Sequence, residues 1–285
     1  MKCLGSILAG AAAGACLFAV AAATKVPRHD RDWVEHLATT AEIAWSSDGG
    51  AVTIAPIRDW QYIPIDDGLA ILEANRQSGT YRTEDLEAVW FVEEPHPGLP
   101  MMAHTFIVFD FGDAATGGGG MVGLTIEARK VDGERYNPLL GALNKYELIY
   151  VWAEPRDLIS RRATLLEHEL YAYRLALSSE QARSYFMALV QRTDDIYEAP
   201  RFYNTLRSNC TNELAKAAGL SWDPAFVFTG GAAEALFNRG LIAGETFETV
   251  RAAAELAPRV KGRNWRVETF NTRLRTLTPE QPTEP

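Results

Sequence analysis

Hydrophobic and polar residues alternate with a short period through the first half of the chain, as expected for β-strands. Turn clusters rich in Gly, Pro and Asp separate these stretches. The pattern predicts strands at 51–55, 86–92, 105–111, 121–129 and 147–153. A Gly-rich segment, 117–120, joins two of them, so 105–111 and 121–129 are expected to form a hairpin.

The second half of the chain follows a helical period instead. Ser178 and Gln181 have the spacing of a capping box, and the apolar residues behind them repeat every three to four positions. The pattern predicts helices at about 178–190, from 208 or 209 to 217, at 232–239 and at 245–257. Because the strands come first and the helices later, the expected fold class is α+β.

The first 23 residues differ from the rest of the chain. A short basic start, Met1-Lys2, precedes an uncharged stretch at 3–23 that ends in small residues. This pattern is typical of a secretory signal, so the protein is expected to be exported to the periplasm. Three interpretations stay open: cleavage of the signal, retention of 3–23 as an inner-membrane anchor, and lipidation at Cys16. An anchor is long enough because about 20 apolar residues span a bilayer.

Composition and charge narrow the classes of partner. The chain has 285 residues, an ordinary globular composition and a formal net charge of −9, with no cluster of Lys and Arg. Electrostatic binding to nucleic-acid phosphates is therefore not expected. Cys and His are not paired at the spacing of a zinc site, so neither a metal nor another cofactor is expected.

Cys210 is the one thiol outside the export segment, because Cys3 and Cys16 both lie within it. It follows Ser208 and Asn209, which are good N-cap residues, and so falls in the first turn of a predicted helix. Unpaired backbone N–H groups and the helix dipole favour a thiolate at that position. Cys210 is therefore a candidate nucleophile; the alternative is a small buried side chain.

A cysteine nucleophile needs a base and a group that orients this base. Of the five histidines, His104 alone opens a predicted buried strand; the alternative is a structural histidine at a strand edge. A hairpin folded symmetrically about its loop makes Glu127 the diagonal neighbour of His104. A shift of the register by two residues would place Glu127 directly opposite, and a shift by one would turn it to the other face. Glu127 is the candidate orienting group, or else a solvent-facing residue of an alternating strand.

Several segments resemble the Lnb N-terminal periplasmic domain family. They are 103–106 (AHTF), 126–130 (IEARK), 146–151 (YELIYV) and 202–211 (FYNTLRSNCT). The resemblance extends over residues 30–275 and includes 238–242 and 270–275. The Asn-Cys-Thr segment and the Ile-Glu-x-Arg-Lys strand are specific when they occur together in this order.

The resemblance implies a circularly permuted papain-like core, in which an antiparallel sheet packs against the helix that carries the nucleophile and His precedes Cys in the chain. It implies Cys210 as the catalytic cysteine, His104 as its histidine and Glu127 as the acidic residue. Backbone N–H groups at the helix start or the side chain of Asn209 would supply an oxyanion hole. Tyr203 and Arg129 would either shape the site or serve packing.

The expected function is acyl transfer through a Cys-His thioester, on lipoproteins, lipids or peptides of the cell envelope. The alternatives are a papain-like amide or ester hydrolase and a catalytically silent periplasmic binding module. The family's namesake is a lipoprotein N-acyltransferase with a membrane bundle after this domain. This chain ends at Pro285 without a second apolar span, so it is expected to correspond to the soluble catalytic portion. Residues 276–285, polar and Pro-rich, are expected to be a disordered tail.

Overall fold

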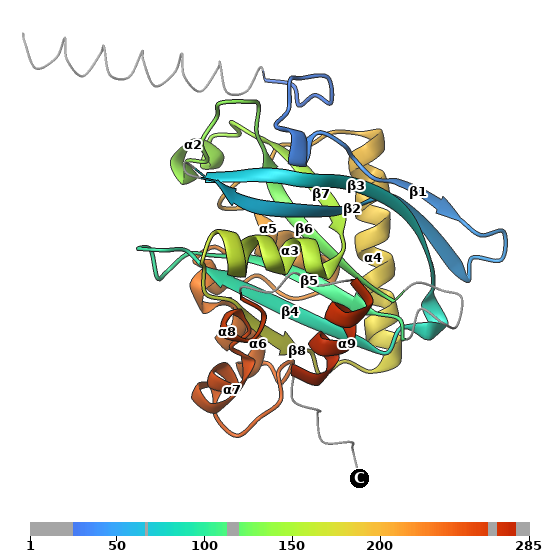
Figure 1. Cartoon of the computed structure of the whole chain (residues 1–285), viewed down its shortest axis with the longest axis vertical. Helices are drawn as coiled ribbons and strands as arrows, with labels where there is room; N and C mark the ends of the chain where they lie inside the picture. The colour runs from blue at the N-terminus through green and yellow to red at the C-terminus, as the bar shows by residue number, and fades with distance from the viewer. Residues whose placement is uncertain (1–24, 66–67, 113–119, 262–266, 278–285) are drawn as a thin grey trace, which may run out of the picture.

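The computed structural model describes residues 25–65, 68–112, 120–261 and 267–277. Expectations for the export segment, for most of the Gly-rich loop and for 278–285 lie outside the described residues. The disordered tail expected from residue 276 is wrong for Thr276 and Leu277, which form the end of the helix Val267–Leu277. The centre of the molecule is an eight-stranded sheet in the order β1-β2-β7-β6-β5-β4-β8, with β3 paired to β2 (Figure 1). The strands are β1 (Glu42–Trp45), β2 (Ala51–Ile65), β3 (Gly68–Arg82), β4 (Ala88–Pro95), β5 (Ala103–Asp110), β6 (Met121–Arg129), β7 (Glu147–Ala153) and β8 (Tyr171–Arg174).

Helices cover both faces of this sheet (Figure 1). The helices are α2 (Pro138–Ala142), α3 (Pro155–Ser160), α4 (Ser179–Glu198), α5 (Cys210–Ala217), α6 (Ala232–Asn238), α7 (Phe247–Ala254), α8 (Ala257–Val260) and α9 (Val267–Leu277). A π-helical turn, Arg161–Leu165, continues α3. Short 3₁₀ turns lie at Glu35–Leu37, Thr83–Asp85, Pro224–Phe226 and Thr229–Gly231.

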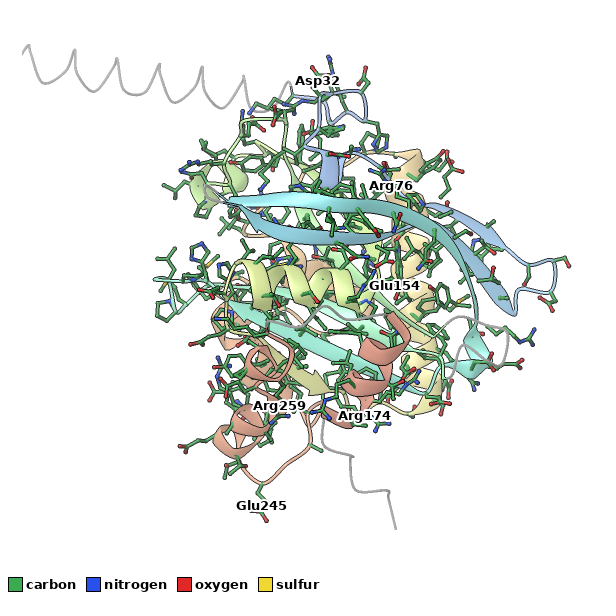
Figure 2. All side chains as sticks on the ribbon, in the orientation of Figure 1. Asp32, Arg76, Glu154, Arg174, Glu245 and Arg259 are labelled. Atoms are coloured by element: carbon green, nitrogen blue, oxygen red, sulfur yellow. The ribbon has the colours of Figure 1, made fainter. Side chains whose placement is uncertain are left out.

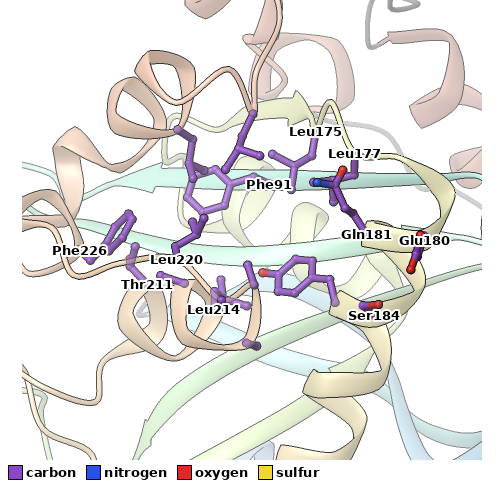
Figure 3. A pocket seen from close by; sticks show the side chains of 17 residues that line it. Phe91, Leu175, Leu177, Glu180, Gln181, Ser184, Thr211, Leu214, Leu220 and Phe226 are labelled. Atoms are coloured by element: carbon purple, nitrogen blue, oxygen red, sulfur yellow. The ribbon is translucent and has the colours of Figure 1, made fainter.

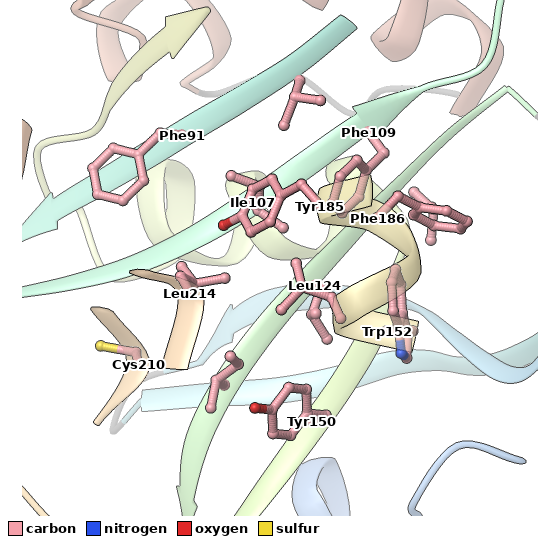
Figure 4. Packing of buried hydrophobic residues seen from close by; sticks show 14 of the residues in the cluster. Phe91, Ile107, Phe109, Leu124, Tyr150, Trp152, Tyr185, Phe186, Cys210 and Leu214 are labelled. Carbon is pink, nitrogen blue, oxygen red and sulfur yellow. The ribbon is translucent and has the colours of Figure 1, made fainter. Parts of the chain in front are cut away.

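Side chains of β5 alternate between two hydrophobic clusters, as the period of two in a strand requires. Ile107 and Phe109 pack with α4 and α5 on one face, where Phe186 is fully buried. Phe106 and Val108 pack with α3, α8 and α9 on the other face. Figure 4 shows the first cluster, in which the ring of Phe109 contacts those of Tyr185 and Phe186. Because both faces are covered, the central strands are buried along most of their length.

The expected α+β class is confirmed, but the sheet is mixed. Strand pairs among the described residues are antiparallel except that β2 and β7 pair in parallel at Arg58 and Ala153. The expectation of an antiparallel sheet is therefore wrong at this junction. A buried ion pair lies beside it, because Arg58 donates to both carboxylate oxygens of Asp157 at the start of α3, at 2.8 and 2.9 Å.

The N-terminal segment is fixed across the end of β6. Trp33 forms a bridge with Val131, and the Val34 N–H donates to the Lys130 carbonyl at 3.0 Å. Arg31 donates to both oxygens of buried Glu147 at 3.0 and 2.8 Å. In Figure 2 Asp32 marks this end of the molecule. The described chain therefore begins at the end of the sheet where β5 starts and β6 finishes.

Candidate active site

Cys210 is the first residue of α5, as the sequence predicts. The side chain of Asn209 caps the helix by accepting the Asn212 N–H at 2.7 Å. Cys210 is nearly buried, but Figure 4 shows its sulfur pointing away from Leu214 and the hydrophobic cluster. It lines a cavity of about 200 Å³, here called the Cys210 cavity, together with His104 and Glu127.

His104 and Glu127 lie opposite each other across β5 and β6. The strand register pairs Phe106 with Thr125, and its continuation by two residues places His104 opposite Glu127. Relative to a symmetric hairpin, the register is shifted by two residues, which is the alternative that places Glu127 directly opposite His104. The expectation of a symmetric hairpin is therefore wrong. The His104 Nε2 atom lies 3.3 Å from Glu127 Oε1, and both side chains keep roughly a quarter of their surface exposed (22% and 28%).

Thr125 connects the imidazole to the carboxylate, a role that the sequence did not reveal. Its hydroxyl lies 2.7 Å from His104 Nε2 and donates to Glu127 Oε1 at 2.9 Å. Since the hydroxyl proton goes to the carboxylate, Nε2 must carry a hydrogen and donate to Thr125. Nδ1 is then the ring nitrogen left to interact with Cys210, which lines the same cavity. The alternation of the strand could have indicated Thr125, because it shares a face with Glu127.

Electrostatics favour an ion pair between the sulfur and the ring. Burial opposes ionisation of the Cys210 thiol, but the charge and hydrogen bond of His104, with hydrogen bonds from Thr105, lower its pKa below the ordinary value. Burial likewise opposes a charged His104, but Glu127 and the Cys210 thiolate raise its pKa to about 10. The imidazolium in turn outweighs burial at Glu127 and holds the pKa of this carboxyl well below its usual range. The geometry therefore suits a thiolate beside an imidazolium at neutral pH.

A buried arginine holds Glu127 from the other side. Arg162, in the π-helical turn, donates from Nε to Glu94 Oε2 at 2.6 Å and from Nη2 to Glu127 Oε1 at 3.3 Å. Glu94 also lies 2.5 Å from His168 Nδ1. A chain of alternating charge thus runs from Glu94 through Arg162 and Glu127 to His104, and His168 contacts its outer end at Glu94. No pattern in the sequence places Arg162 here, because it comes from a segment outside the hairpin.

Comparison with known proteins supplies the family. The model of the Lnb N-terminal periplasmic domain matches residues 73–237, which is more than half of the chain. The chain belongs to this family. No curated protein and no solved structure matches it at a significant level. His104, Glu127, Arg162 and Cys210 all fall within the matched span.

Membership in the Lnb N-terminal periplasmic domain family indicates an exported protein, as the sequence predicts. Anchoring in the inner membrane stays a prediction. Among the helices that the structure describes, none combines the length and the apolar character needed to cross a bilayer. Nor do three or more His, Cys, Asp or Glu side chains gather as potential metal ligands anywhere in the described ranges.

The supporting residues proposed from the sequence have different surroundings in this Lnb-family domain. Asn209 donates both hydrogens of its side-chain amide, to the carbonyls of Thr205 and Phe226 at 2.9 Å each. It therefore has no amide hydrogen left for an oxyanion and acts as a helix cap that ties two loops together. Tyr203 is buried in the wall of the Cys210 cavity, where its hydroxyl accepts from Tyr136 at 3.5 Å. Burial raises the pKa of Tyr203 well above its ordinary value, so its hydroxyl stays protonated.

Arg129 serves packing rather than the site. Its guanidinium donates to the carbonyls of Leu37 and Ala38 at 2.8 and 2.6 Å and lies over the ring of Trp33. These contacts fasten the N-terminal segment to the end of β6. Burial lowers the pKa of Arg129 to about 10. The contacts of Arg129 therefore support a role in packing and not a role in shaping the site.

A larger, mainly apolar pocket of about 470 Å³ lies along α5 on the side away from the sulfur (Figure 3). Phe91, Leu214 and Leu220 form part of its wall. Thr211, which follows Cys210 in α5, lines this pocket, and its hydroxyl lies 2.8 Å from that of Thr105. The cavity with the reactive groups is therefore the smaller of the two.

Proposed function

We propose that this protein transfers acyl groups through a thioester on Cys210, with His104 as the proton carrier, in a circularly permuted papain-like arrangement. One observation carries the proposal. Cys210 at a helix start, His104 on β5 and Glu127 on β6 meet in one cavity, although about a hundred residues separate His104 from Cys210. This arrangement supplies a nucleophile, a base and an orienting carboxylate together.

The proposed first half-reaction begins with attack of the Cys210 thiolate on an ester or amide carbonyl. The carbonyl oxygen gains the negative charge, and the backbone N–H groups at the start of α5 are the candidates for stabilising it, since they have no partner within the helix. As the intermediate collapses, the bond to the leaving oxygen or nitrogen breaks and the His104 imidazolium gives that atom its proton. The products are a thioester on Cys210 and a neutral imidazole.

The second half-reaction returns the proton. The neutral imidazole of His104 takes a proton from the acceptor, which attacks the thioester carbonyl and expels the thiolate. An amine acceptor gives transfer, whereas water gives hydrolysis; the groups supplied by the protein are the same. Glu127, held by Thr125 and Arg162, keeps Nε2 as the donor and leaves Nδ1 for the sulfur.

The experiment that tests this proposal is acylation of the full chain by a p-nitrophenyl ester of a fatty acid. Mass spectrometry of peptides should find one acyl group on Cys210, with release of p-nitrophenol, and Cys210→Ala should give neither. Cys16→Ala is the matched control and should react like the wild type. Turnover of Cys210→Ala at the wild-type rate would refute the proposal.

A further inference from the structure

Exposed apolar side chains gather around the mouth of the Cys210 cavity. Two groups of them, here called the α2 lip and the hairpin lip, together form the rim. The α2 lip consists of Leu139, Leu140, Leu143 and Leu206, and the hairpin lip of Leu99, Met101 and Phe228. Leu139 is 75% exposed and Met101 59%, so neither contributes much to the core. Clustered exposed apolar groups of this kind mark interaction surfaces, whereas single ones need no explanation.

The α2 lip is continuous with one wall of the Cys210 cavity. Tyr136 and Thr205 line the cavity, and the Thr205 hydroxyl donates to the Pro138 carbonyl at the first turn of α2 at 2.8 Å. Asn204 donates from its side chain to the Ala142 carbonyl at 3.0 Å. These bonds fix α2 against the loop that carries Leu206, so the four leucines of this lip project from a single unit.

The hairpin lip borders the opposite wall. Ala103 and Thr229 line the cavity and hydrogen-bond to each other, with the Ala103 N–H donating to the Thr229 hydroxyl at 2.7 Å. The Gly230 N–H donates to the Met101 carbonyl at 3.1 Å, which ties the loop of Phe228 to the β4–β5 turn. In Figure 1 this turn and α2 lie on the same side of the molecule. The cavity therefore opens between two apolar lips.

The start of the chain leads to the same place. Trp33 and Val34 are fixed beside Lys130, which itself lines the Cys210 cavity. Residues 3–23 carry no charge and have the length to span a bilayer. The ten residues from 23 to 33 reach at most about 35 Å when extended. A leader held in a bilayer would thus keep the rim close to the membrane surface.

We infer that the rim docks on a lipid bilayer, which places the mouth of the Cys210 cavity at the membrane surface. Leucine, methionine and phenylalanine offer a bilayer apolar area and no charge to desolvate. The docking concerns binding alone and is measured without turnover.

The test is hydrogen exchange of the full chain with and without vesicles of phosphatidylethanolamine and phosphatidylglycerol. With vesicles, amides at 96–102, 136–144 and 226–230 should exchange more slowly, on the order of tenfold. The double variant Leu139→Ser/Met101→Ser should lose this protection, because each change removes exposed apolar surface from one lip. Trp45→Ser, at an exposed apolar residue on β1, is the matched control and should keep it.

Three results would overturn the docking. They are unchanged exchange at the rim, protection that survives in the double variant, and protection that grows with protein concentration without lipid. The last would mean that the rim joins two copies of the chain. Cys210→Ala should keep the lipid protection. If Cys210→Ala keeps both the lipid protection and acyl transfer, only the proposed function fails. If acylation requires Cys210 but the rim of the wild type is not protected by lipid, only the docking fails.

Discussion

The reactive groups form an alternating series of charges in a space that is mostly shielded from water. Burial alone would keep both the Cys210 thiol and the His104 ring neutral, but each stabilises the charge on the other. Glu127 extends the series and is itself held by Thr125 and Arg162. The thiolate–imidazolium ion pair should therefore persist over the pH range from the lowered pKa of the Cys210 thiol up to the pKa of His104, about 10. Above that pH the ring loses its proton and with it the ability to protonate a leaving group.

Arg162 should be the residue of this series whose loss costs the most stability. Arg162→Met leaves Glu94 and Glu127 without their shared cation, and breaking a buried ion pair from one side typically costs about 3–5 kcal/mol. Urea unfolding at pH 7 measures this loss. Glu94 is ionised there because Arg162 and His168 outweigh burial and hold its pKa at about 2.

The control for this change is Arg183→Met, which removes an exposed arginine that donates a long hydrogen bond, 3.3 Å, to the Glu84 carbonyl. It should shift the free energy of unfolding by less than about 0.5 kcal/mol. Equal losses in the two variants would mean that Arg162 does not stabilise the carboxylates.

At the scale of elements, the helix start is what brings the nucleophile into position. Asn209 caps α5 and also joins the 205 loop to the 226 loop through its amide. The first turn is thereby fixed against two loops that border the Cys210 cavity. The position of Cys210 and the stabilisation of its thiolate therefore both depend on the N-cap residue Asn209.

Asn209→Ala should lower the free energy of unfolding by about 1–2 kcal/mol through the lost cap. It should also slow alkylation of Cys210 by iodoacetamide at pH 7, because the helix start becomes less ordered. Ser178→Ala removes the cap of α4 instead, and should cost similar stability without slowing the alkylation. If Asn209→Ala alkylated as fast as Ser178→Ala, the reactivity of the Cys210 thiolate would not depend on an ordered helix start.

Elements with strong local signals were predictable from the sequence, and those held by distant partners were not. The capping box of α4 and the N-cap of α5 occur where local spacing indicates them. β3 escaped prediction because most of its side chains from 71 to 80 are exposed, which leaves no apolar alternation. β2 runs past Pro56, a residue that usually argues against a strand interior. Arg162 became recognisable only once the path of α3 was fixed. Thr125 shares a strand face with Glu127 in the sequence pattern, but its contact with His104 depends on the register of β5 and β6.

At the scale of the whole molecule, buried polar contacts join segments that are far apart in the chain. Glu154, between β7 and α3, accepts a hydrogen bond from the side chain of Gln77 of β3 at 2.5 Å. Burial, followed by the charge of Asp59, raises the pKa of Glu154 to about 8. The fold therefore holds this carboxyl in its protonated form at neutral pH.

The sign of the pH effect follows from this raised pKa. The folded chain keeps a proton that the unfolded chain loses above about pH 4.5, so the contribution of Glu154 to stability declines from there up to pH 8. Glu154→Gln should remove this decline, and its gain over the wild type should grow from pH 5 to pH 8 in urea unfolding. Glu245→Gln, in an exposed loop, is the control (Figure 2). A gain that did not change with pH would show that Glu154 is ionised in the fold.

The most direct test is a titration of Cys210, by the rate of its alkylation against pH in the full chain, followed on the Cys210 peptide by mass spectrometry. The account predicts a thiol pKa below the ordinary value of about 8.5. It also predicts that His104→Ala raises this pKa, since only the hydrogen bonds from Thr105 and the helix start then oppose burial. A wild-type thiol that titrates at or above the ordinary value, and is unmoved by His104→Ala, would contradict it.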